Sequence, residues 1–68
     1  MIVMMYEDGC YTEDVSLGQF CKDVLIAIDD GSDIDVITDN RVEIRRFEVD
    51  PNGCEYVMTY TYVLGVDN

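Results

Sequence analysis

Residues 17–30 carry the clearest structural pattern in the chain, the hydrophobic period of an amphipathic helix. Apolar side chains recur there at intervals of three and four residues, which places them on one helix face. Ser16 and Gln19 match a capping box at the start, and Gly31 is a typical helix stop. We therefore predict a helix over residues 17–30. Its core-facing stripe is predicted to be Leu17, Phe20, Cys21, Val24, Leu25 and Ile28.

The rest of the chain carries the alternation and the turn signals of β-strands. Residues 2–7 are predicted as a strand, and the continuous apolar run of residues 2–6 within it indicates burial on both faces. Residues 10–15 are predicted as a loop or a short strand. Three further strands are predicted over residues 33–38, 41–49 and 54–64. The turn sequences between them are Asp39-Asn40 and Asp50-Pro51-Asn52-Gly53.

The predicted order β-α-β-β-β gives one α+β domain over residues 1–68. It is a two-layer sandwich of one helix on a mostly antiparallel four-stranded sheet. In residues 41–49 the alternation breaks between Ile44 and Phe47, which predicts a bulge near Arg45 and Arg46. In residues 54–64 both parities are apolar, so either face of this strand can be the core.

Charge and composition exclude several functions. The chain has 15 acidic residues, 4 basic residues and no histidine, for a net charge of −11. Direct nucleic-acid binding needs the opposite charge, and histidine-dependent catalysis and imidazole metal sites are excluded. No apolar run approaches the ~18 residues of a membrane span, and anionic lipids repel an acidic surface. Three cysteines make no closed disulfide framework, so we expect a reducing cytoplasm and buried or idle thiols.

No motif in the chain indicates catalysis or a bound cofactor. No carboxylate is placed by the sequence in an apolar pocket, and so small a domain has little room for a cleft of about 300 Å³. We therefore expect a non-enzymatic protein without cofactors. A calcium loop starting at Asp29 fails, because Gly31 and Ile34 occupy the third and sixth positions. A loose, weak calcium or magnesium site stays open as an alternative.

The acidic residues are concentrated in the first part of the chain. Residues 1–40 contain ten acids and one base, and the densest run, Asp29–Asp39, has five acids in eleven residues. Asp33 and Asp35 on a strand point the same way about 6.6 Å apart, close to the spacing of phosphates along one DNA strand. Such a row can occupy a groove of Lys and Arg, although an ordinary solvated face is the alternative. The predicted partner-binding residues are Asp29, Asp30, Asp33, Asp35, Asp39, Glu13 and Asp14.

In size, α+β build and acidity, the chain resembles the small acidic proteins of phages and mobile elements, such as anti-CRISPR proteins and DNA mimics. The residues that carry this resemblance are the Asp29–Asp39 run with Glu7, Asp8, Glu13 and Asp14. The resemblance implies a stoichiometric inhibitor in the cytoplasm of a bacterial host. Its partner would be a protein or ribonucleoprotein with a basic nucleic-acid-binding groove, such as a CRISPR effector that grips DNA and reads a PAM.

A second function of a different class rests on the tyrosines of the last strand. If the face with Tyr56, Tyr60 and Tyr62 is exposed, it is a secondary interface, because tyrosine is enriched in such contacts. A long strand at a sheet edge can also pair with its copy in a homodimer. On this interpretation the protein is a structural or regulatory module that dimerises or joins an assembly.

Overall fold

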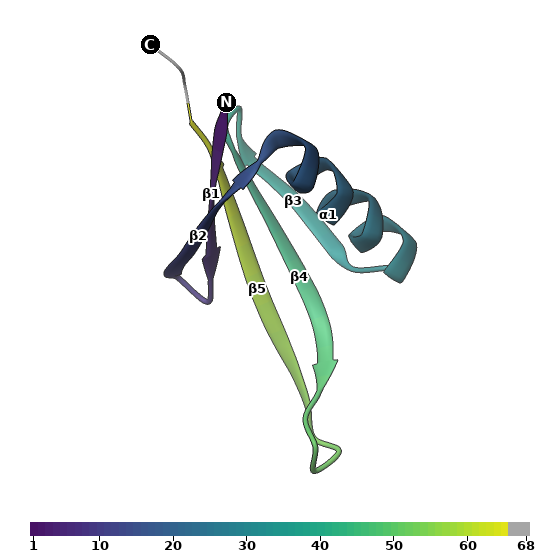
Figure 1. Cartoon of the computed structure of the whole chain (residues 1–68). Helices are drawn as coiled ribbons and strands as arrows, with labels where there is room; N and C mark the ends of the chain where they lie inside the picture. Colours follow the sequence, from purple (N-terminus) through teal and green to yellow (C-terminus); the bar gives the residue numbers. More distant parts are fainter. Residues whose placement is uncertain (66–68) are drawn as a thin grey trace.

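Residues 1–65, which the computed structural model describes, form one helix and five strands in the order β-β-α-β-β-β (Figure 1). The elements are β1 (Ile2–Glu7), β2 (Cys10–Ser16), α1 (Leu17–Asp30), β3 (Asp33–Thr38), β4 (Arg41–Val49) and β5 (Glu55–Leu64). The α+β class is confirmed. The predicted four strands and the order β-α-β-β-β are wrong, because β2 is a full strand. Its side chains are exposed except Val15, so it has no apolar alternation and is held by its backbone ladder to β1.

All strand pairs are antiparallel, and the strands lie in the order β2-β1-β5-β4-β3. The helix joins the two edge strands, β2 and β3, and lies across one face of the sheet (Figure 1). The strands β3, β4 and β5 form a meander, in which each strand pairs with the next along the chain. However, β5 is the central strand, and β1 pairs with it from Tyr60 to Leu64, so only its first residues, 55–58, have the free edge that pairing with a second copy requires.

Both ends of α1 follow from local chemistry. Ser16 Oγ accepts a hydrogen bond from the Gln19 backbone N–H at 3.1 Å, as the capping signal predicts. The Gln19 side chain donates to Asp23 instead of returning to Ser16, so only half of the capping box forms. Gly31 ends the helix with φ +74°, and the N–H groups of Gly31 and Ser32 close a Schellman motif.

The helix is rotated relative to the predicted stripe. Phe20 and Ala27 are buried and Val24 is half-buried, whereas Leu25 and Ile28 are 66% and 61% exposed. The apolar stripe of the helix is wider than its contact with the sheet. Leu25, for example, lines a groove between α1 and the edge strand β3 and is not packed in the core. The core cluster consists of Val3, Met5, Phe20, Ala27, Ile44 and Tyr62.

Within residues 1–65, the sheet is covered by the helix on one face only. Val3 and Met5 point to the helix while Ile2 is exposed, so burial of residues 2–7 on both faces is a wrong prediction. In β5 the face with Tyr60, Tyr62 and Leu64 packs against the core.

The β4–β5 ladder runs without a register shift from Arg41 to Val49, so the predicted bulge near Arg45 and Arg46 does not form. The alternation breaks for another reason. Beyond the strands that flank them, the ends of β4 and β5 extend as a hairpin arm, residues 46–58, whose ladder is made only of these two strands (Figure 1). Phe47 lies there, 69% exposed, with the parity of the face opposite the helix.

Both predicted turns are confirmed. Asp39 and Asn40 join β3 to β4. At the tip of the hairpin arm, the Asp50 carboxylate accepts hydrogen bonds from the backbone N–H groups of Asn52 and Cys54, both at 2.9 Å. Gly53 supplies the positive φ, +83°, that this turn needs.

Candidate functional site

Five of the predicted partner-binding residues lie along one side of the molecule. Asp29 and Asp30 end α1, Asp33 and Asp35 are on β3, and Asp39 is in the turn that follows. We call these five residues the acidic edge, because β3 is a free edge of the sheet. Asp33 and Asp35 share one face of β3, as the spacing predicts, and it is the face directed away from the helix core.

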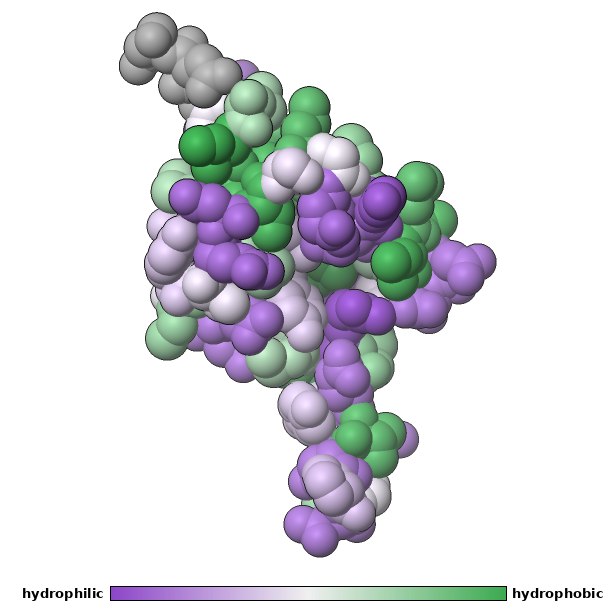
Figure 2. Space-filling model, viewed as in Figure 1, coloured by the Kyte–Doolittle hydropathy of each residue, from purple (hydrophilic) through white to green (hydrophobic). Residues whose placement is uncertain are grey.

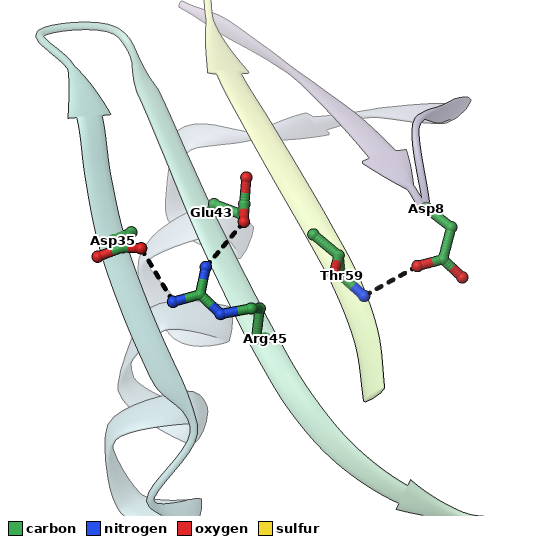
Figure 3. Close-up of polar contacts among 5 residues, drawn as sticks. All are labelled: Asp8, Asp35, Glu43, Arg45 and Thr59. Atoms are coloured by element: carbon green, nitrogen blue, oxygen red, sulfur yellow. Dashed lines mark hydrogen bonds and ion pairs between the residues drawn. The ribbon is translucent and has the colours of Figure 1, made fainter. Parts of the chain in front are cut away.

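Two residues of the acidic edge are neutralised by arginines of β4. Asp35 is 2.9 Å from Arg45, which also reaches Glu43 at 2.9 Å (Figure 3). The hydrogen bond with Asp35, and then that with Glu43, raises the pKa of Arg45. Asp30 pairs with Arg46 at 2.8 Å. The acidic edge therefore has fewer uncompensated negative charges than the sequence alone indicates.

Three carboxylates of the acidic edge have no arginine partner in residues 1–65. Within residues 1–65, the side chains of Asp29, Asp33 and Asp39 make no hydrogen bond or ion pair, and all three are exposed. Asp33 and Asp39 are separated by six residues, about 20 Å of extended chain. Asp33 and Asp39 thus present separated negative charges at the border of the sheet, and Asp29 adds a third charge in the helix layer.

Glu13 and Asp14 do not join this edge. They lie on β2, at the opposite border of the sheet, four strand spacings or about 19 Å away. Asp14 accepts a hydrogen bond from the Tyr11 hydroxyl at 2.9 Å, which raises the pKa of Tyr11. Glu13 pairs with Met5 in the ladder and faces the helix side. The predicted seven-residue surface is therefore split between two edges.

The tyrosines of β5 do not form one exposed stripe. Tyr62 is only 4% exposed, and its ring packs against that of Phe20 in a tilted arrangement with centroids 5.2 Å apart. Its hydroxyl donates a hydrogen bond to Asp23 at 3.0 Å. Burial, and then the hydrogen bond to Asp23, raises the pKa of Tyr62 well above its ordinary value. Tyr60 is half-buried, and only Tyr56, on the hairpin arm, is exposed. The predicted secondary interface is thus reduced to Tyr56.

A cavity of about 340 Å³ lies between the first half of α1 and the sheet. We call it the polar pocket. Its polar lining is Glu13, Gln19, Asp23 and Arg46, with two tyrosines and a few core residues beside them. Little room for a cleft of about 300 Å³ is expected in so small a domain, and the structure nevertheless has one of this size. Sequence reasoning missed the pocket because all five of its elements, α1, β1, β2, β4 and β5, come together only in the fold.

A second cavity, the apolar groove of about 370 Å³, lies between α1 and the strands β3 and β4. Apolar side chains line almost all of it, among them Val24, Leu25, Ile34 and Val36. Figure 2 shows hydrophobic surface exposed over the helix side and also on the hairpin arm. The arm carries Phe47, Val49, Tyr56 and Val57, all exposed.

We also looked for reactive thiols, metal sites and membrane-spanning helices in residues 1–65. Cys10, Cys21 and Cys54 are free, and all three are exposed. Of the two expected alternatives, buried or idle thiols, burial is therefore wrong, and idle thiols stay a prediction. Among residues 1–65 no group of three Cys, Asp or Glu side chains is placed to hold a metal ion. No helix in the same residues is long and apolar enough to cross a membrane.

Searches against protein-family models, curated proteins and solved structures found no match. Arguments about function therefore rest on the residues of this chain.

Proposed function

We propose that this protein is a stoichiometric inhibitor that binds, through its acidic edge, the basic nucleic-acid-binding groove of a bacterial defence complex. A CRISPR effector in the cytoplasm of a bacterial host is the kind of partner that fits. The observation that supports this proposal most directly is a set of three unpaired carboxylates around β3: Asp29 near the end of α1, Asp33 on this edge strand and Asp39 in the turn that follows.

The charge arithmetic of this edge favours a basic partner. Two arginines neutralise Asp30 and Asp35, and no base lies between Asp29 and Asp39 in the sequence. Unpaired carboxylates repel one another, so their concentration on one side of a small domain opposes folding. A groove of Lys and Arg removes this repulsion and gains charge-assisted contacts, with fast and salt-sensitive association.

The test is capture of the tagged protein's partner from a lysate rich in CRISPR effectors, followed by binding measurements with the purified complex. The variant Asp29→Asn, Asp33→Asn, Asp39→Asn removes three charges from the acidic edge. The matched control Glu7→Gln, Glu48→Gln, Glu55→Gln removes three charges elsewhere, at side chains without a hydrogen bond or ion pair in residues 1–65.

We expect the first variant to weaken binding at least about tenfold and the control to keep it within about twofold to threefold. Excess duplex DNA should displace the protein, and binding should weaken across a salt series. Equal losses in both variants would mean that only net charge matters. If DNA does not compete, the contact lies outside the nucleic-acid groove.

The hairpin arm supports a second candidate, a module that joins an assembly, including a dimer of this chain. Phe47, Val49, Tyr56 and Val57 are exposed on a projection that no other strand covers. Replacing Phe47 by Ser should then abolish assembly in sedimentation experiments, while the acidic-edge variant assembles normally. The opposite pattern favours the inhibitor.

A further inference from the structure

The polar pocket has the size and layering of a small-molecule site. Its volume of about 340 Å³ is in the range of ligand pockets, about 300–1,000 Å³. Met5 and Ile44, both buried core residues, form its apolar depth. Glu13 and Gln19 are exposed members of the lining, so polar groups lie toward solvent. Such a site suits a ligand with a short apolar stem and a polar head.

The charges of the lining favour a cationic head. The Glu13 carboxylate makes no hydrogen bond or ion pair with residues 1–65. Asp23 is held in place by two donors, the Tyr62 hydroxyl at 3.0 Å and the Gln19 amide at 2.9 Å. Arg46 is the only base of the lining, and Asp30 already pairs with it at 2.8 Å. Two carboxylates thus remain without a counter-charge.

Aromatic rings add to this preference. Tyr60 and Tyr62 both line the pocket, and the negative face of a tyrosine ring attracts guanidinium and ammonium groups. An anionic ligand would meet the negative charges of Glu13 and Asp23, and the charge of Arg46 is already balanced by Asp30. A neutral ligand would leave the Glu13 charge uncompensated.

We propose that the polar pocket binds an organic cation, an alkylguanidinium or alkylammonium group, between Glu13 and Asp23. Its stem lies against the apolar depth and its head is bound by the two carboxylates. The cation can be a free small amine or the side chain of an arginine or lysine in a protein partner. This inference uses no residue of the acidic edge except the Asp30 that holds Arg46, so it stands independently of the proposed inhibitor function.

The experiment titrates the full chain with N-acetylarginine amide and records backbone amide shifts at physiological salt. N-acetylcitrulline amide is the neutral probe of the same shape, and putrescine is the free amine. We expect the arginine probe to shift the amides of Glu13, Gln19 and Asp23 first, and the citrulline probe to shift none. If putrescine binds more tightly than the arginine probe, the natural ligand of the site is a free amine. The reverse assigns it to a protein side chain.

Two variants separate a site from general attraction to an acidic protein. Glu13→Gln should weaken the arginine probe about fivefold or more, because it removes one charged partner. Asp14→Asn, the neighbour on the opposite face of β2, removes the same charge and should leave affinity within about twofold. Thermal melts show whether each variant is folded. Equal effects of the two variants, citrulline binding, or first shifts at the acidic edge would each overturn the proposal.

Discussion

The rotation of α1 can be tested with one methylene deletion made at two sites. Ile44 is 2% exposed beneath the helix, whereas Ile28, which the sequence places in the core stripe, is 61% exposed. Deleting a buried methylene from Ile44 as Ile44→Val should cost about 1 kcal/mol of unfolding free energy. In a domain of this size that corresponds to a loss of about 4–8 °C in Tm.

The matched change Ile28→Val should cost much less. A buried methylene contributes about 0.8 kcal/mol, and scaling this by the two fifths of Ile28 that is covered gives about 0.3 kcal/mol. Urea unfolding followed by circular dichroism measures both values, and the unchanged slope with urea confirms that the comparison concerns stability. If Ile28→Val costs as much as Ile44→Val, the helix packs by the predicted stripe and the rotation is refuted.

Three further predictions concern a buried hydroxyl, a pH dependence and a helix end. Tyr62→Phe removes the donor to Asp23 and should lower the unfolding free energy by about 1 kcal/mol in the same urea assay. Because the pKa of Tyr62 is raised in the folded state, the unfolded chain loses this proton first. The contribution of Tyr62 to the unfolding free energy should therefore be fully present below pH 10, its ordinary pKa, and decrease above it. In a series of thermal melts at increasing pH, Tyr62→Phe should reduce this decrease. Gly31→Ala forces a side chain into the left-handed region at φ +74° and should lower the unfolding free energy by about 1 kcal/mol. Gly18→Ala, within the helix, should not lower it. Equal effects of the two changes would contradict the Schellman cap.

The helix ends and turns could be predicted because their chemistry is local. Ser16, Gly31 and the Asp50–Gly53 turn each act on backbone groups within a few residues. The strand β2 could not be predicted with the same ease. Its only partly buried side chain is Val15, and its pairing with β1 depends on backbone groups that every residue has. The face of β5 was undetermined because both of its parities are apolar, and only the position of α1 decides between them.

The candidate site divides in the same way. Asp33 and Asp35 share a face because a strand alternates, and that follows from spacing alone. Their unequal charge does not follow, because Arg45 lies directly opposite Asp33 in the ladder yet pairs with Asp35 and Glu43. The polar pocket is formed by residues from five elements, so no local sequence pattern predicts it.

The strand β3 presents two different surfaces to anything that approaches this edge. Asp33 and Asp35 occupy one face, while Ile34 and Val36 face the apolar groove on the other, with Val36 73% exposed. Solubility explains exposed carboxylates, but it does not explain why the apolar side chain of Val36 is left exposed on the opposite face of the same strand. A nucleic-acid groove in a protein offers both basic side chains and apolar walls, so it can satisfy both faces at once. The combination of carboxylates and an exposed apolar side chain therefore supports the proposed binding of a protein partner at the β3 edge.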